Sequence, residues 1–267
     1  MRETPKVRIY HRPDLVRLYR AHYILGQEFM GEPEPEFMDL LRRLPPRSRL
    51  LDVGIGYGRN AAQAVIRGHS VVGIDLMPEA LSAADIFIRR TVAGPRQRLA
   101  NFGIAPGRWS LRRQDLERSR LKVGGRFDAV VTHYATQDLS ARAIRRVIKS
   151  MQGKTAAGGI FQGTFLIELE RGEPRMGEDV PFKERDESQI HSLFDSGELI
   201  RTRVKGVSRI SRKEMARLIS KLFSAREWGI VRQQIEPVAW QHPYATDLTS
   251  LKSASRGLLL KFEALKK

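Results

Sequence analysis

A glycine-rich turn directly after a short apolar run is the feature that most limits what this chain can fold into. Residues 49–53 read as a buried strand, and Gly54, Gly56 and Gly58 follow it before a helical segment begins. Glycine has no Cβ, so the backbone N–H groups of such a turn can approach a ligand closely. A strand, a glycine turn and a helix in this order predict an open parallel sheet that binds its ligand at the carboxyl ends of its strands.

Strand and helix patterns alternate through the rest of the chain. Short apolar runs are separated by segments with apolar residues at helical spacing, which is the pattern of a parallel sheet with helices on both faces. We therefore predict an α/β, Rossmann-like, mostly parallel sheet of seven strands. The predicted strands are residues 49–53, 70–75, 109–113, 127–132, 160–167, 230–238 and 257–262, and the main helices are 60–67, 78–88 and 144–151.

Two segments lie outside this alternation. Residues 1–48 are predicted to form an N-terminal helical lid, and residues 49–267 the ligand-binding domain. An insertion at about 166–226 begins as an acidic, glycine- and proline-broken stretch. It ends in a predicted helix at 211–223, whose apolar face packs either on the protein's own core or on a second subunit of a homo-oligomer. Both segments are candidates for binding the substrate.

The composition limits location and chemistry. The chain has 267 residues and no cysteine, which excludes disulfides, thiolate metal sites and a cysteine nucleophile; no metal is expected. It has no long apolar run and no signal-like start, so we expect a cytoplasmic protein with no membrane partner. The net charge is +17, which favours polyanions or an anionic acceptor unless it only solvates the surface.

The residue that closes the second predicted strand indicates the kind of ligand. Asp75 lies 21 residues after Gly54, the spacing at which an acidic side chain accepts hydrogen bonds from ribose hydroxyls. A dinucleotide-binding turn would have the pattern G-x-G-x-x-G, but Arg59 stands at the position of its last glycine. The NAD interpretation is therefore the weaker one.

The pattern of an acidic residue followed by x-G-x-G-x-G, from Asp52 to Gly58, resembles the first motif of class I S-adenosylmethionine (SAM)-dependent methyltransferases. The resemblance covers roughly residues 49–165 and the returning C-terminal strands, and it implies an enzyme with SAM as cofactor and S-adenosylhomocysteine as product. A weaker likeness, through Arg59 and Asn60, is to the tellurite-resistance and thiopurine-type branch that acts on small molecules.

The resemblance also implies roles for individual residues. Asp52 and the three glycines would hold the methionine part of SAM, and Asp75 its ribose. Leu76 and Met77 would lie beside the adenine, Asp115 would bind its amino group, and Leu116 would pack against its ring. Arg59 would bind the carboxylate of SAM or of an anionic substrate, or only begin the helix. Asn60 is a further predicted cofactor residue, and His133 would lie near the transferred methyl group.

His133 and Tyr134 follow the predicted strand 127–132 and are the candidate catalytic residues. A histidine with a pKa near neutral suits a general base for a hydroxyl or protonated amine. The alternative is that His133 packs against SAM, and that Tyr134 lines the pocket or hydrogen-bonds the acceptor.

The function predicted is methyl transfer from SAM to an N or O atom of a small-molecule acceptor. An Asp/Asn-Pro-Pro-aromatic motif for exocyclic adenine is absent after the fourth strand, and cytosine C5 chemistry would need cysteine. One alternative is a tRNA or rRNA methyltransferase, because residues 201–232 hold ten basic and two acidic residues. Another is a SAM-binding regulator without catalysis.

Overall fold

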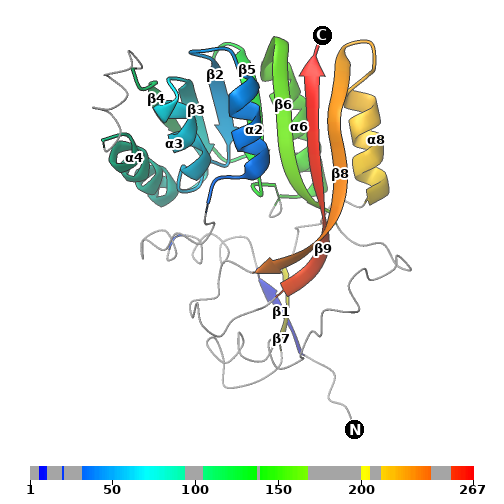
Figure 1. Ribbon diagram of the computed structural model, residues 1–267. Helices are drawn as coiled ribbons and strands as arrows, with labels where there is room; N and C mark the ends of the chain where they lie inside the picture. Colours follow the sequence, from blue (N-terminus) through cyan, green and yellow to red (C-terminus); the bar gives the residue numbers. More distant parts are fainter. Residues whose placement is uncertain are drawn as a thin grey trace.

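The computed structural model describes residues 6–10, 20, 32–93, 105–136, 139–167, 200–204, 212–241 and 254–267. Its helices and strands alternate along most of this length (Figure 1). In chain order they are β1 (Lys6–Tyr10), α2 (Pro35–Arg43), β2 (Arg49–Val53), α3 (Arg59–Ile66), β3 (Ser70–Asp75), α4 (Pro78–Ala93), β4 (Trp109–Arg113), β5 (Phe127–His133), α6 (Ala141–Lys154), β6 (Thr155–Ile167), β7 (Ile200–Val204), α8 (Arg212–Leu222), β8 (Trp228–Gln241) and β9 (Ala254–Lys266).

The main sheet has seven strands in the order β4-β3-β2-β5-β6-β9-β8. The five strands from β4 to β6 pair in parallel, whereas β9 pairs antiparallel with both β6 and β8. The strand order reverses between β2 and β5, so their carboxyl ends form the switch point at which open sheets bind ligands. This confirms the predicted α/β fold and places the glycine turn, which follows β2, at the switch point.

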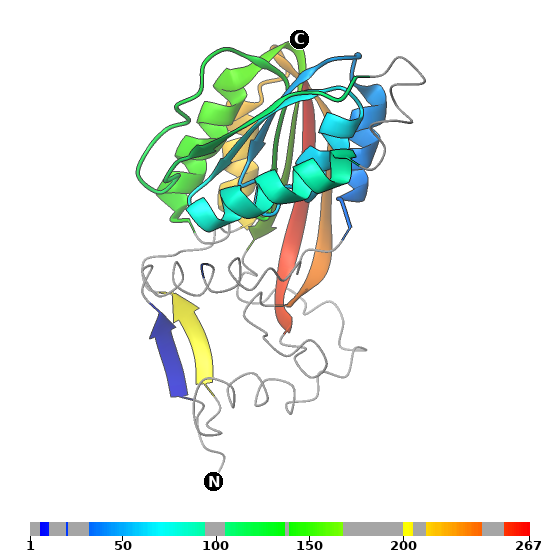
Figure 2. The same ribbon diagram turned by 90° about the vertical axis from the view of Figure 1, so that its left-hand side faces the viewer.

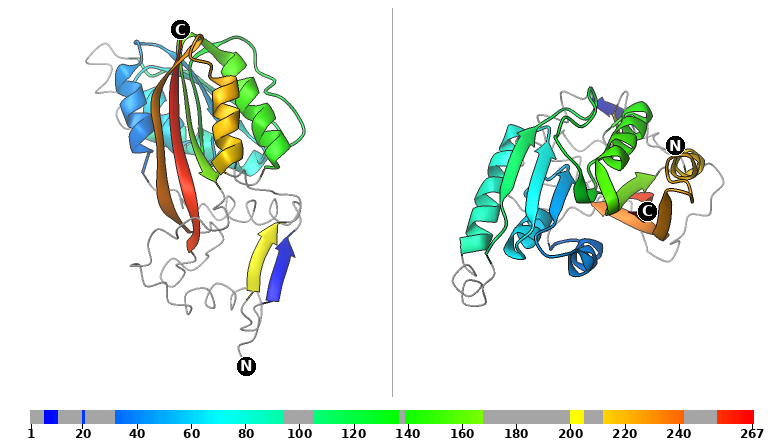
Figure 3. Two further views of the ribbon diagram at one scale, coloured as in Figure 1. Left: turned by 90° about the vertical axis from the view of Figure 1, so that its right-hand side faces the viewer. Right: turned by 90° about the horizontal axis from the view of Figure 1, so that it is seen from above.

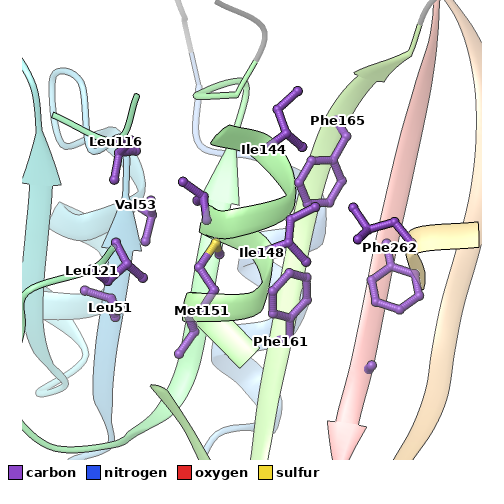
Figure 4. Packing of buried hydrophobic residues seen from close by; sticks show 14 of the residues in the cluster. Leu51, Val53, Leu116, Leu121, Ile144, Ile148, Met151, Phe161, Phe165 and Phe262 are labelled. Atoms are coloured by element: carbon purple, nitrogen blue, oxygen red, sulfur yellow. The ribbon is translucent and has the colours of Figure 1, made fainter. Parts of the chain in front are cut away.

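Helices cover both faces of the sheet, seen from above in Figure 3. One hydrophobic cluster joins α2, α3 and α4 to Leu50, Val71 and Val131, and the other joins α6 and α8 to Leu51, Val130 and Phe161. Figure 4 shows the second cluster, with Ile148 of α6 beside Phe161 and Phe262 of the strands. Neighbouring residues of β2 thus enter opposite cores, which explains why its sequence is a nearly continuous apolar run.

The helix predicted at 211–223 as part of the insertion belongs to this second core. Met215, Ile219 and Phe223 are buried in the cluster, and the Phe223 ring packs at 4.7 Å from that of Phe262. The apolar face of α8 therefore packs on the protein's own sheet. Residues 168–199 and 205–211 of the predicted insertion lie outside the described residues, and its role in substrate binding stays a prediction.

Residues 6–10 form a strand, so the prediction that residues 1–48 are helical is wrong at this point. Charged and apolar residues alternate from Lys6 to Ile9, a period of two that suits a strand. This strand pairs in parallel with β7, from which it is separated by about 190 residues of chain, a pairing that local periodicity does not reveal. Figure 2 shows this small sheet on the side of the carboxyl ends of β2, β5 and β6.

The last two strands are longer than predicted. The sequence predicts strands at residues 230–238 and 257–262. In the structure the corresponding strands β8 and β9 have 14 and 13 residues. They form a hairpin that continues beyond the carboxyl end of β6, on the side where the switch point lies (Figure 1). Within the described part of the chain, every helix is too short or too polar to cross a membrane.

Candidate functional site

The glycine turn holds three alternate glycines in left-handed backbone conformations. Gly54, Gly56 and Gly58 have φ values of 82°, 53° and 77°, which L-residues with a Cβ adopt only with strain. At Gly54 there is also no room for a side chain, because an added Cβ would lie 2.0 Å from the Cβ of Ala135. The N–H groups of Gly54 and Ile55 donate to the Ile74 carbonyl at 2.8 and 3.0 Å, which ties the turn to β3.

The Asp75 carboxylate is fixed in place by this turn. Gly56 N–H donates to Oδ2 and Met77 N–H donates to Oδ1, each at 3.0 Å. Burial raises the pKa of Asp75, and these backbone donors oppose that rise. A carboxylate has about four acceptor positions, and the backbone of Met77, Gly56 and Leu76 acts on three of them, so one remains for a further donor. A ribose hydroxyl fits this remaining position.

Asp52 is a buried carboxyl group directly before the turn. Its side chain is 5% exposed, and burial raises its pKa to about 7, with a lowering contribution from Arg59 and a raising one from Asp75. A buried carboxyl group of this kind is stabilised in its charged form by a cationic ligand. SAM, with an ammonium and a sulfonium centre, fits this requirement.

Arg59 and Asn60 bind the chain that leads into α2. The Arg59 guanidinium donates to the Glu32 carbonyl and pairs with the Glu34 carboxylate, while Asn60 Oδ1 accepts the Glu34 N–H at 3.0 Å. These two residues therefore connect the glycine turn to the segment before the sheet. Their predicted contacts with SAM stay predictions.

The predicted adenine residues gather at the ends of the neighbouring strands β3 and β4. Gln114 N–H donates to the Asp75 carbonyl at 2.8 Å, which aligns the two strand ends. Asp115 Oδ1 accepts the Glu117 N–H at 2.9 Å, and its Oδ2 lies 3.5 Å from Arg118. Met77 and Leu116 are buried, and Leu76 is half-buried. The fold thus brings the predicted set to one edge, while its contacts with adenine stay untested.

His133, at the end of β5, is buried with 7% of its surface exposed. Its Nδ1 lies 3.0 Å from the Thr164 hydroxyl of β6, and its ring meets that of Phe37 of α2 edge-on. Burial, with the charge of Arg59, lowers its pKa to about 3, and Glu36 and Gln162 act in the opposite direction. The imidazole is therefore neutral at neutral pH, and its role as a general base stays a prediction.

Tyr134 follows in a left-handed conformation, with φ 56°. Such a conformation in a non-glycine residue is strained and is often found at functional sites. Burial and the charge of Glu34 raise its pKa to about 12, and Lys261 acts in the opposite direction. Tyr134 is therefore a protonated phenol, a hydrogen-bond donor among charged side chains at the switch point.

A polar network between α2 and the strands β6 and β9 was not predicted. Gln162 Nε2 donates to the Glu36 carbonyl at 3.0 Å and to Glu263 Oε2 at 2.9 Å, and Glu36 pairs with Lys261 at 2.7 Å. Arg43 binds both oxygens of Glu263 at 2.8 Å. These partners are about 100 to 220 residues apart in the chain, and no local motif in the sequence indicates them.

Glu36 Oε2 is buried without a hydrogen-bond partner among the described residues, and His133 Nε2 and Gln162 Oε1 have no partner there beyond each other. The three side chains are neighbours, because Gln162 binds the Glu36 backbone, and the charge of Glu36 and a hydrogen bond with Gln162 both raise the pKa of His133. Buried polar atoms are nearly always paired. This cluster beside the end of β5, here called the orphan cluster, therefore has acceptor positions to spare at Glu36 Oε2 and Gln162 Oε1, while His133 Nε2 donates or accepts according to its tautomer.

The sheet order, the glycine turn and the fixed Asp75 together define the fold and cofactor site of class I SAM-dependent methyltransferases. Residues 50–159 match the family described as "Methyltransferase domain". This part of the chain is therefore a methyltransferase domain.

Solved structures share the fold at low sequence identity. TehB from Haemophilus influenzae is 14% identical with a TM-score of 0.55 over 88% of this chain, which spans 62% of the length of that protein. A SAM-dependent methyltransferase from Methanosarcina mazei is 14% identical, with a TM-score of 0.54, 88% of this chain and 98% of that one covered. Magnesium protoporphyrin IX methyltransferase from Synechocystis, with bound S-adenosylhomocysteine, is 13% identical with a TM-score of 0.51, covering 87% and 82%. At these identities the likeness shows the fold.

Proposed function

We propose that this methyltransferase transfers the methyl group of SAM to a nitrogen or oxygen atom of a small-molecule acceptor that carries an N–H or O–H group. The observation that carries the proposal is the orphan cluster. The cluster lies at the carboxyl end of β5, directly before Tyr134, and next to the strand ends that hold the predicted cofactor residues.

The chemistry of the orphan cluster favours a donor on the acceptor. Both side-chain N–H groups of Gln162 donate to oxygen atoms, those of the Glu36 carbonyl and the Glu263 carboxylate. These two bonds fix the orientation of the amide, and its Oε1 can act only as an acceptor. The pKa of Glu36 is lowered, with Lys261 and Arg232 opposing the effect of burial, so Glu36 is an anion at neutral pH. Two fixed acceptors suit an amine or a hydroxyl and do not suit a purely carbon nucleophile.

Burial supports a small acceptor. Gln162 is 3% exposed and His133 7%, and the first turn of α2 covers them through Glu36 and Phe37. A group that reaches these atoms must enter between α2 and the sheet. A small molecule meets this requirement more easily than a base in a folded polymer.

When bound, SAM supplies an electrophilic methyl group on a positively charged sulfur. Asp75 would hold its ribose, and Asp52 would balance the positive charge of its methionine end. Tyr134 would donate a hydrogen bond to the acceptor, and the acceptors Glu36 and Gln162 would orient its N–H or O–H group. Alignment and exclusion of water are the main demands of such a transfer. The pKa of His133 is lowered to about 3, so the proton that leaves the acceptor atom would pass to solvent.

The proposal is tested by incubating the full chain with SAM and small molecules that carry amine, hydroxyl, thiol or activated carbon groups. S-adenosylhomocysteine is quantified and the new methyl group is located by mass spectrometry. Methylation at nitrogen or oxygen is expected, and transfer only to sulfur, carbon or bulk RNA would contradict the proposal.

The variant Gln162→Leu separates acceptor binding from cofactor binding. Loss of one hydrogen bond costs about 1.5 kcal/mol, so the acceptor KM is expected to rise about tenfold while SAM affinity stays unchanged. Asp85→Asn, which alters a carboxylate on the outer side of α4, is the matched control and should change neither value. An unchanged KM in Gln162→Leu would contradict the role of the orphan cluster.

A further inference from the structure

The outer surfaces of α6 and α8 carry the same pattern of basic side chains. On α6 the exposed bases recur at intervals of three and four residues, and on α8 at intervals of four, so each helix presents one basic stripe away from its buried side. We define this basic face by its exposed members Arg142, Arg145, Lys149, Lys213, Arg217 and Lys221.

The two stripes run side by side. α6 and α8 are in contact and lie next to each other on one face of the sheet (Figure 3). α6 leads directly into β6, and α8 into β8. These strands both pair antiparallel with β9, so the two helices run in the same direction. Three charges extend over about 10–12 Å along each helix, and packed helices lie about 8–10 Å apart. The basic face is thus a compact block of positive charge.

The opposite face of the sheet is arranged differently. Two of the exposed bases there have acidic partners on their own helices: Arg89 pairs with Asp85 on α4 at 2.7 Å, and Arg42 pairs with Asp39 on α2. The sequence of α6 contains no acidic residue, so no such pair can form within that helix.

We propose that the basic face binds the phosphate backbone of a nucleic-acid duplex. A duplex carries one negative charge per about 1.7 Å of its axis when both strands are counted, so a patch of 10–12 Å spans about six or seven phosphates, and those on the near side meet the basic face. Recognition of single strands depends on exposed aromatic platforms. Among the described residues the exposed large hydrophobic side chains are Ile86, Ile230, Val231 and Leu265, none of them aromatic. The basic face thus suits backbone contacts with a duplex. This inference does not depend on the identity of the methyl acceptor.

The test measures binding of the full chain to a fluorescein-labelled RNA duplex by fluorescence anisotropy over a range of KCl concentrations, with a DNA duplex as a second arm. Each phosphate contact contributes about −0.9 to the slope of log K against log salt, so six bases predict a slope of up to about −5. The variant Arg142→Gln, Arg145→Gln, Lys149→Gln should reduce that slope by about 3 units, since each contact contributes about 0.9. Glutamine is a good helix former, and an unchanged melting curve checks the fold.

The matched control removes three charges from exposed arginines of the other face, Arg42→Gln, Arg67→Gln and Arg90→Gln. The slope in this control should stay close to that of the parent protein. Equal losses in both variants would overturn the proposal, because binding would then follow net charge alone. Absence of duplex binding at low salt, or stronger binding to vesicles of anionic phospholipid that the same triple variant abolishes, would overturn it as well. Binding of RNA alone, DNA alone or both supports it and identifies the partner.

Discussion

Arg59, the first residue of α3, pairs with Glu34, the residue directly before α2, and so connects the cofactor turn to the chain that precedes the sheet. Both side chains are mostly buried, at 14% and 10% exposure. Asn60 adds a second connection by accepting the Glu34 N–H. The glycine turn is thus held from outside by α2 as well as from within by Asp75.

The pairing predicts coupled effects of substitution. Arg59→Gln and Glu34→Gln should each lower the free energy of unfolding by about 2–3 kcal/mol, because each leaves one buried charge without its partner. The double variant should lose less than the sum of the two. A double-mutant cycle by urea denaturation measures this coupling.

The same variants test whether Arg59 also binds SAM. If Arg59 acts through Glu34, the two single variants weaken SAM binding equally in calorimetry. A larger loss in Arg59→Gln than in Glu34→Gln would support direct contact with the cofactor. Additive effects on the free energy of unfolding would show that the ion pair does not stabilise the fold.

A second prediction concerns Gly54. Gly54→Ala should abolish SAM binding and destabilise the protein, because the new Cβ would meet Ala135 at 2.0 Å and the residue has a φ of 82°. Gly153→Ala in α6 is the matched control, since nothing lies within 4 Å of its Cβ position. Alanine in a helix is favoured by up to about 1 kcal/mol, so the control should keep SAM affinity and melt slightly higher. Equal melting temperatures and affinities for the two variants would contradict the proposed geometry of the turn.

Much of the fold could be predicted because its signals are local. The run from residue 49 to Gly58 contains both the strand and the turn, and Asp75 closes the next strand at a fixed distance along the chain. Parallel strands bring such strand ends together whatever connects them. The position of the cofactor residues therefore follows from short segments of sequence.

The rest depends on contacts between distant segments. Lys6–Tyr10 finds its strand partner in β7, far along the chain, and Glu36 binds Lys261 and Gln162. Each of these residues looks like an ordinary surface residue in its own segment. The partners of α2 are set by the antiparallel insertion of β9 beside β6, and no periodicity in residues 35–43 indicates that neighbour.

Asp75 provides a direct test of the cofactor site. Asp75→Asn keeps the shape of the side chain and replaces one of the two oxygens that the structure fixes, so both a backbone hydrogen bond and a predicted ribose contact are lost. Hydrogen bonds to a charged group contribute about 1.5–3 kcal/mol each, so SAM affinity should fall by about tenfold to more than a hundredfold. Calorimetric titration measures this loss. SAM affinity equal to that of the parent protein would contradict the assignment, and Asp85→Asn serves as the surface control.

Asp52 predicts a dependence on pH. Its pKa is raised from 3.8 to about 7 by burial, so folding favours the protonated form. The contribution of Asp52 to stability without ligand should therefore decrease as the pH rises from about 4 to about 7 and stay constant above that. Asp52→Asn removes this titration, and at pH 8 it should melt at a higher temperature than the parent protein while binding SAM more weakly.

Binding of SAM should have the opposite dependence on pH. A cationic ligand favours the carboxylate, so at pH 6 binding releases a proton from Asp52, and affinity increases as the pH rises towards 7. His133, with a pKa of about 3, does not titrate in this range. Calorimetry at pH 6 in two buffers with different ionisation enthalpies counts the protons released. The parent protein should release more than Asp52→Asn, and equal release from both would show that Asp52 stays in one protonation state when SAM binds. Because the charges of Asp52 and Asp75 interact, the difference reports the pair of buried carboxyl groups at the glycine turn.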